Sequence, residues 1–509
     1  MKKILVSALI AVLAAGLSSC SKDALNTSPT DSVTGESMFE NATAALVPLN
    51  GIYRSMYTAW STSGNTHQVF GISAYALAAD VMGDDHIQDA QGSGWFWYDC
   101  IYDVKEAFTS SSWRSYDLWN AYYTWISNAN YIIAAKETMA GAPSDVNYVI
   151  GQAYAIRAYS YFMLAQWFAR TYVGHEDDPG VPIYTEPTIA GTEGAPRGTL
   201  RDTYAQINAD IDTAVARLTN SYAQTHSSHI DMYVANGIKA RICLVQERWE
   251  DAIEAARIAK QGGTLTADVT SGMNNRNQSD VLWAAEIIDS QSGIYASFFM
   301  HMVYDGSDGY GNTAHKQISA NLYNKMSAND VRRAWWDPNS DVSESTRYQQ
   351  MKFQWADKTT YTGDYIWMRT PEMYLVEAEA LCMLGRDAEA QQVLTEFMQY
   401  RQEGYGTQKT GTAMGALTSD ETGSLREEII NQRRIELWGE YGRIFDIRRL
   451  HQGFVRTEEM GWPTETLLTG LHTDNPDSWD WVLTIPQAEF DANKSLNQDV
   501  DQNPIDSGI

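Results

Sequence analysis

Apolar residues recur at helical spacing over much of the chain, and this periodicity constrains the fold more than any other feature. Alternating steps of four and three residues place side chains on one face of an α-helix. The clearest examples are Leu118, Tyr122, Trp125, Ala129 and Ile132, and Tyr204, Ile207, Ile211, Ala214 and Leu218. A third segment, 154–168, is apolar nearly all round, which is typical of a helix inside a larger bundle. The sequence therefore predicts a mainly α fold.

Two later stretches have the pattern of paired helices. The first runs from 235 to 259 and the second from 374 to 397, and each has a break near its middle. Alanines within both stretches allow two helices to approach closely. These units resemble tetratricopeptide repeats. We therefore expect a tetratricopeptide-like helical scaffold.

The region between the repeats, about 261–365, does not follow this periodicity. It is rich in Gly, Asn, Asp and Ser with isolated aromatic residues, as in 305–312 (DGSDGYGN), and such a composition indicates loops. Loops held by a rigid scaffold often carry binding residues. The insertion is therefore expected to form a ligand surface.

The N-terminus has the features of a secretory signal. Lys2 and Lys3 precede an apolar run, 4–17, that is shorter than the roughly 20 residues needed to span a bilayer. The run ends in small residues before Cys20, and 17–20 (LSSC) resembles the lipobox of bacterial lipoproteins. We expect residues 1–19 to be cleaved and Cys20 to receive lipid. Residues 20–35 are polar and are expected to form a flexible, lipidated tether.

Charge and cysteine usage exclude several classes of protein. The formal net charge is −27, and a chain this acidic would be repelled by the phosphates of nucleic acid. The other cysteines, Cys100, Cys243 and Cys382, are odd in number and lack C-x-x-C spacing. They indicate neither a disulfide framework nor a zinc site. We therefore expect these three thiols to be buried and unreactive.

Five sequence blocks, taken in order, resemble the SusD/RagB family of nutrient-uptake proteins of Gram-negative bacteria. The blocks are 49–53 (LNGIY), 79–85 (ADVMGDD), 155–162 (AIRAYSYF), 433–449 (RRIELWGEYGRIFDIRR) and 483–498. The arginine-rich fourth block is the most specific. Trp438 and Tyr441 depart from its pattern but keep an aromatic character. The resemblance runs from the lipobox to the C-terminus.

This resemblance implies a lipid-anchored protein on the surface of the cell outer membrane. Such a protein captures nutrients, most often oligosaccharides and in RagB-like relatives peptides, for a SusC-type TonB-dependent transporter. It implies a SusD-like N-terminal helical region, 36–230, and a RagB/SusD C-terminal region, 231–509. The transporter supplies the energy, so no cofactor and no catalytic activity are expected of this chain.

The residues themselves offer little support for an enzyme. With 64 acidic residues, some carboxylate pair at a glycosidase-like separation is unavoidable, so a surface glycoside hydrolase is the less favoured alternative. His226 and His229 place two imidazoles near each other, but no H-E-x-x-H is present. A pair of histidines in a polar loop is the simpler interpretation.

The charged residues of the arginine block are predicted to be structural. Closely interleaved opposite charges favour a salt-bridged scaffold over an anion site. A single arginine on an apolar helix, Arg157, is expected to be a paired core residue. The predicted structural residues are Arg157, Arg433, Arg434, Glu436, Glu440, Arg443, Asp446 and Arg448.

Aromatic residues in polar, glycine-bearing loops are the candidate ligand contacts. The chain has 17 Trp and 29 Tyr against 13 Phe, and a flat ring with a polar tip suits the apolar face of a sugar. Nearby carboxylates would accept hydrogen bonds from sugar hydroxyls. The predicted ligand-binding residues are Asp84, Asp85, Trp95, Trp97, Tyr98, Tyr304, Tyr310, Trp335 and Trp336.

Overall fold

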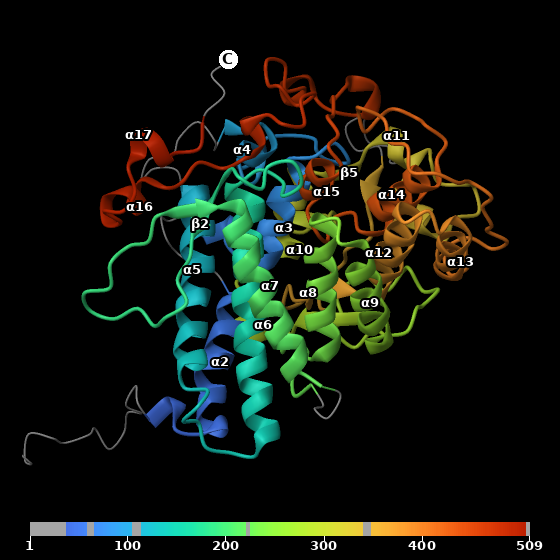
Figure 1. Ribbon diagram of the computed structural model, residues 1–509. Helices are drawn as coiled ribbons and strands as arrows, with labels where there is room; N and C mark the ends of the chain where they lie inside the picture. Colours follow the sequence, from blue (N-terminus) through green and yellow to red (C-terminus); the bar gives the residue numbers. More distant parts are fainter. Residues whose placement is uncertain (1–36, 59–65, 104–112, 220–223, 339–347, 505–509) are drawn as a thin grey trace, which may run out of the picture.

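The chain folds into a mainly helical protein (Figure 1). The computed structural model describes residues 37–58, 66–103, 113–219, 224–338 and 348–504. Long helices of the N-terminal region lie side by side, with α6 packed against α2, α5 and α7. The helices of this region are α2 (Ala42–Ser55), α3 (Ile72–Val81), α4 (Trp97–Cys100), α5 (Trp113–Ala134), α6 (Pro143–Phe168) and α7 (Leu200–Arg217).

Both predicted helix pairs are confirmed. The first is α8 with α9 and the second is α12 with α13, and α12 also packs against α9 and α14. The remaining helices are α8 (Met232–Val245), α9 (Trp249–Ala259), α10 (Phe298–Met302), α11 (Ala320–Tyr323), α12 (Thr370–Met383), α13 (Asp387–Met398), α14 (Leu425–Glu436), α15 (Arg443–Arg449), α16 (Gln487–Ala492) and α17 (Gln498–Asp501). The scaffold is therefore tetratricopeptide-like, as predicted.

Helix α6 is the centre of the N-terminal region, and its residues from Tyr148 to Phe168 are all buried. This agrees with the segment that is apolar nearly all round. Its lone arginine, Arg157, donates two hydrogen bonds to Asp210 on α7, at 2.8 and 2.6 Å, and one to Asn130 on α5. The charge of Arg157 is therefore neutralised within the core, and its hydrogen bonds join α5, α6 and α7.

The insertion consists of loops held by short strands. Strand β4 (Val281–Ala285) pairs antiparallel with β8 (Tyr365–Arg369). A four-stranded sheet has the order β1-β5-β7-β6 and joins the insertion to the N-terminal region. Its strands are β1 (His86–Gln88), β5 (Lys316–Ile318), β6 (Trp336–Asp337) and β7 (Gln349–Gln350); β2 (Pro179–Pro182) and β3 (Arg197–Thr199) form a separate pair.

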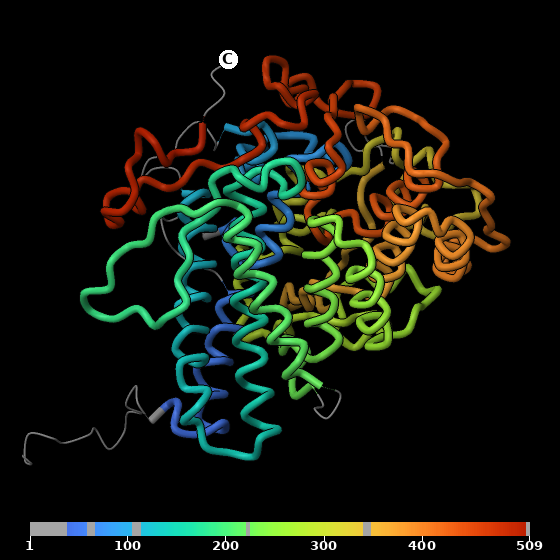
Figure 2. Tube along the Cα trace, viewed as in Figure 1, coloured from blue at the N-terminus to red at the C-terminus, as the bar shows by residue number. Residues whose placement is uncertain are grey.

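The C-terminal part of the chain returns to the N-terminal helices. Leu483 donates its N–H to the Trp167 carbonyl, and the Asn503 amide donates to the Phe168 carbonyl, so the end of α6 is capped by chain from the far terminus. Figure 2 shows this segment in red crossing above the blue and green helices. The fold is thus closed by contacts that are very distant in sequence.

Two smaller predictions concern the described residues. Cys100, Cys243 and Cys382 are free and buried, as expected. None of the described helices is both long and apolar enough to cross a membrane. Cys20, the signal and the tether lie outside the residues that the structure describes.

Candidate functional site

Four aromatic rings from separate loops meet at the surface and are here called the aromatic platform: His67, Trp95, Tyr295 and Tyr310. The His67 ring lies at its centre, with centroid distances of 5.1 Å to Trp95, 5.8 Å to Tyr295 and 5.7 Å to Tyr310. Trp95 and Tyr310 meet edge to face at 5.9 Å. Two predicted ligand residues, Trp95 and Tyr310, are thereby brought together.

Buried neighbours hold these rings in place. Phe96, which has a left-handed backbone with φ of 59°, turns into the core, and its N–H donates to Gln68 at 2.8 Å. The adjacent Trp95 is left half-buried. On the other side, the buried ring of His301 stacks on Tyr310 at 5.0 Å and bonds to the His67 carbonyl at 2.6 Å. The platform is therefore preformed.

Two of the groups at the platform, His301 and Tyr310, are uncharged at neutral pH. Burial lowers the pKa of His301 to about 3, so that its imidazole carries no charge. Burial raises the pKa of Tyr310, so the phenol keeps its proton. Tyr295 is the most open ring, with 46% of its surface exposed. A partly exposed aromatic surface suits a ligand that has apolar faces.

Two further predicted aromatics lie on neighbouring loops. Tyr98 is exposed, and its hydroxyl accepts a hydrogen bond from Gln91 at 3.4 Å. Tyr304 is exposed and packs edge-on against His315, which is paired with Asp89. Asp89 and Gln91 belong to the loop that continues to Trp95. Both tyrosines therefore contact segments next to the platform.

Three of the predicted tryptophans are buried instead of exposed. Trp97 lies in α4 and is 8% exposed, and Trp335 and Trp336 are each 1% exposed. Trp335 donates its indole N–H to the Val269 carbonyl, and the ammonium group of Lys352 lies 4.4 Å from its ring centre. The prediction that these three rings contact ligand is wrong, because the fold uses them as core.

The prediction for Asp84 and Asp85 is also wrong, because both carboxylates are buried. Asp85 accepts hydrogen bonds from Arg434 at 2.8 and 2.7 Å, and Asp84 pairs with Arg443 at 2.9 Å. Burial raises the pKa of Asp84, but Arg443 and Arg434 outweigh it and bring that pKa down to about 2. These acids serve the arginine block and do not face a ligand.

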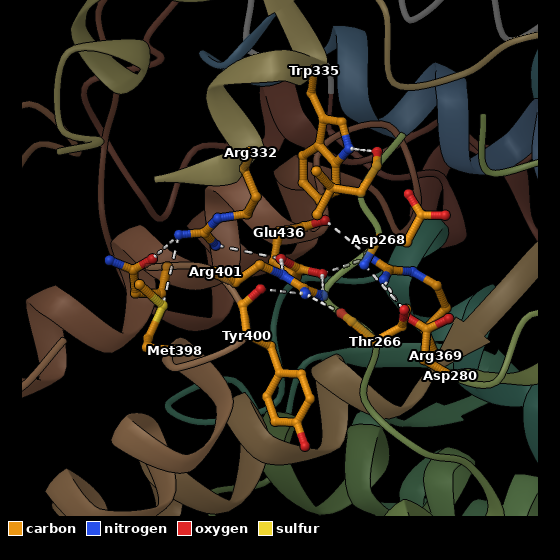
Figure 3. Close-up of polar contacts among 12 residues, drawn as sticks. Thr266, Asp268, Asp280, Arg332, Trp335, Arg369, Met398, Tyr400, Arg401 and Glu436 are labelled. Carbon is orange, nitrogen blue, oxygen red and sulfur yellow. Dashed lines mark hydrogen bonds and ion pairs between the residues drawn. The ribbon is translucent and has the colours of Figure 1, made fainter. Parts of the chain in front are cut away.

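The arginine block forms the buried ion-pair scaffold that its charge pattern indicated. Its centre is Glu436, whose carboxylate lies between Arg332, Arg369 and Arg401 at 3.4, 3.0 and 2.9 Å (Figure 3). The Arg401 guanidinium also donates to the Thr266 carbonyl at 2.6 Å. Helix α14 is thereby linked to three other parts of the chain.

The other predicted structural residues have comparable partners. Arg433 donates to Asp446 at 2.7 Å, and Glu440 pairs with Arg369 at 2.7 Å. Arg448 instead donates to the backbone carbonyls of Gln166 and Ala169 at the end of α6. Burial lowers the pKa of Arg448 to about 10, which leaves it charged at neutral pH.

Acid stability should reveal the Asp84 ion pair. The folded pKa of about 2 lies below the roughly 3.9 of an unfolded aspartate, so the pair stabilises the fold above pH 4 and this contribution is lost as pH falls towards 2. We expect it to be worth on the order of 2–3 kcal/mol. Urea unfolding midpoints measured from pH 5 to pH 2.5 should fall less steeply in Asp84→Asn than in the unchanged protein. Equal slopes would contradict this assignment.

The histidine pair, His226 and His229, shows no metal site. His229 is buried and bonds to Asn50 and Tyr148, and burial lowers its pKa to about 4. Among the residues that the structure describes, no group of three or more potential metal-ligating side chains is found. The polar-loop interpretation therefore agrees with the geometry.

Two residues of the platform escaped the sequence analysis. His67 stands in a polar segment, and Tyr295 follows a Ser-Gly-Ile sequence in the insertion. The composition that singled out Tyr310, an aromatic ring in a glycine-bearing polar loop, also describes Tyr295 and could have identified it. No comparable signal marks His67.

Comparison with known proteins agrees with this architecture. The family described as "Starch-binding associating with outer membrane" matches residues 68–244, and the SusD family matches residues 298–505. The SusD-like protein P38 of Formosa agariphila is 20% identical over 502 residues, covering 89% of this chain and 92% of that protein.

Solved structures share the fold over nearly the whole chain. A SusD-like carbohydrate binding protein from Bacteroides vulgatus has a TM-score of 0.74 at 24% identity, covering 92% of this chain and 99% of that one. A SusD superfamily protein from Bacteroides thetaiotaomicron has a TM-score of 0.73 at 22% identity, with coverages of 91% and 100%. Surface glycan-binding protein A from Bacteroides fluxus has a TM-score of 0.65 at 17% identity, with coverages of 91% and 99%. The two family matches together cover most of the chain, which belongs to the SusD family.

Proposed function

We propose that this protein captures oligosaccharides at the outer surface of the cell and delivers them to a SusC-type TonB-dependent transporter. The single observation that carries the proposal is the aromatic platform, a preformed ring surface on the SusD scaffold. Relatives of the same fold are described as carbohydrate-binding and glycan-binding proteins. Binding and hand-over require no catalytic group, so we propose no enzymatic activity.

The chemistry of the platform fits a sugar chain. The rings contact one another at centroid distances of about 5–6 Å, and their exposed parts can stack on the C–H faces of sugars. The rings also carry polar atoms at their edges, which can exchange hydrogen bonds with hydroxyl groups. Stacking supplies affinity, and the polar edges supply orientation.

A peptide is the alternative ligand, and a direct comparison separates the two. Isothermal titration calorimetry can compare a panel of neutral oligosaccharides with a panel of tri- to octapeptides. We expect at least one oligosaccharide to give a heat of binding. Binding of peptides alone would replace the proposed ligand. Release of smaller sugars during incubation, followed by anion-exchange chromatography, would instead support the hydrolase alternative.

Membrane attachment is proposed to depend on Cys20. A Cys20→Ala variant should lose metabolic labelling by fatty acid and appear as a soluble protein or an unprocessed precursor, because stable anchoring needs the acyl chains attached at this thiol. Cys243→Ala is the matched control, since that thiol is buried in α8 and should not affect labelling. Lipid label that persists in the Cys20→Ala variant would remove the lipoprotein proposal.

A further inference from the structure

A cavity lined in part by aromatic side chains is here called the lateral groove. It has a volume of about 390 Å³ and is lined by α5, the connection between β2 and β3, and α16. Volumes of roughly 300–1,000 Å³ are usual for sites that hold small molecules. None of the four platform residues lines it.

Helix α5 provides one wall of the groove. Tyr116, Asn120, Tyr123 and Ser127 follow one another at steps of four, three and four residues, so they share a face of the helix. All four are half-buried. A helix face that carries two phenol rings, a carboxamide and a hydroxyl is thus turned towards the cavity.

The opposite wall is tied together by hydrogen bonds from distant segments. The Asn493 amide, which follows α16, donates to the Ala195 carbonyl at 2.9 Å and to Glu489 at 2.8 Å. Ala195 in turn donates its N–H to the Tyr184 hydroxyl at 3.0 Å. Figure 2 shows the long green connection between β2 and β3 projecting beside α5, below the red C-terminal segment.

The two walls are also joined to each other. The Asn130 amide on α5 donates to the Tyr184 carbonyl at 3.0 Å, and the Trp119 indole donates to Glu489 at 3.0 Å. The groove therefore exists before any ligand arrives. A preformed site avoids the entropy cost of ordering loops on binding.

The chemistry of the lining favours a polyhydroxylated ligand. Burial raises the pKa values of Tyr123 and Tyr184, so both phenols stay protonated. Most of the polar groups in the lining are hydroxyls and carboxamides, which both donate and accept hydrogen bonds, as sugar hydroxyls do. No lysine or arginine is found among its described lining residues, which argues against an anionic ligand.

A cation is less well matched than a sugar. Glu489 already accepts a hydrogen bond at each carboxylate oxygen, from Trp119 and from Asn493. The other carboxylate of the lining, Glu193, is exposed to solvent. We infer that the lateral groove is a second carbohydrate site, which holds a neutral mono- or disaccharide independently of the aromatic platform.

The groove can be tested by filling it. Ala492 is exposed on its rim, and Ala492→Trp places a large side chain in the cavity without removing a contact. Tyr116→Ala is a second variant that removes a ring. Saturation-transfer NMR on the purified protein would use glucose, galactose, mannose, xylose, maltose and cellobiose as probes. Both variants should weaken binding of at least one of these sugars by about tenfold or more.

Two controls separate this site from the platform. Ala328→Trp makes the same change at an exposed alanine outside the groove and should leave sugar binding unchanged. The platform variant Trp95→Ala/Tyr295→Ala should retain the groove signal. Loss of all sugar signal in that platform variant, with none lost in Ala492→Trp, would overturn the inference. Binding of tetramethylammonium in place of sugars, sensitive to Ala492→Trp, would also overturn it and assign the groove to cations.

Discussion

Replacement of Glu436 by glutamine is expected to lower the free energy of unfolding by about 3–5 kcal/mol, because it leaves buried charges without their partner. Glu436 is fully buried between Arg332, Arg369 and Arg401 (Figure 3). Arg332 and Arg369 each keep a second carboxylate. Arg401 has no other carboxylate at ion-pair distance among the described residues, so it loses its counter-charge and keeps only hydrogen bonds to backbone carbonyls such as that of Thr266.

Urea unfolding followed by tryptophan fluorescence measures this loss. Burial raises the pKa of Glu436, but Arg401 and Arg369 outweigh it and hold that pKa well below its usual range, so the carboxylate is ionised at neutral pH. Glu465→Gln makes the same chemical change at an exposed position and should alter stability by less than about 0.5 kcal/mol. If both variants unfolded at the same urea concentration, the scaffold interpretation of the arginine block would be wrong.

Removal of two platform rings, in Trp95→Ala/Tyr295→Ala, is expected to abolish measurable binding of the glycan at the platform. A stacked ring contributes on the order of 1–3 kcal/mol by analogy with other stacking on aromatic side chains. Two rings therefore correspond to an affinity loss between about thirty-fold and more than a thousand-fold. The fold should survive, since Tyr295 is 46% exposed and Trp95 is half-buried.

Calorimetry with the glycan identified by the panel would test this expectation. Tyr400→Ala is the matched control, because Tyr400 is a comparably exposed ring that follows α13, away from the platform loops. Its affinity should equal that of the unchanged protein. Equal affinities in the control and in the double variant would place the ligand elsewhere, while a melting temperature that fell in the double variant alone would show that the rings support the fold.

The helical scaffold was predictable because a helix packed on one face has a periodic pattern of apolar residues in its own sequence. The apolar periodicity around Trp125 and Ile211 identified α5 and α7, and the two helix pairs were found from breaks between alanine-bearing segments. Short strands were not predicted. They pair residues from distant segments, as β1 does with β5, and two or three residues carry too little pattern to be recognised.

The site was predictable only in part. Trp95 and Tyr310 stood out as large rings in polar, glycine-bearing loops. Their neighbour His67 did not, because its place depends on contacts such as that with Tyr310, 243 residues along the chain. A surface built from rings of separate loops exists only after the scaffold has brought those loops together.

The wrong predictions have a common physical cause. Trp335 and Trp336 precede Asp337 and Pro338, and Asp84 and Asp85 follow a glycine, so their local sequence resembles that of an exposed loop. Burial depends on partners from elsewhere in the chain, as Arg434 provides for Asp85 and the Val269 carbonyl for Trp335. Those partners are not visible from either segment alone.

The Asp85 ion pair makes the N-terminal region depend on residues that are very distant in the sequence. Arg434 follows Asp85 by 349 residues, and β1 likewise pairs with β5 from the insertion. Until the arginine block is present, closing the core around Asp84 and Asp85 would bury two carboxylates without a counter-charge, which is costly. C-terminal truncations that remove Arg434 and Arg443 would therefore leave Asp84 and Asp85 without their counter-charges.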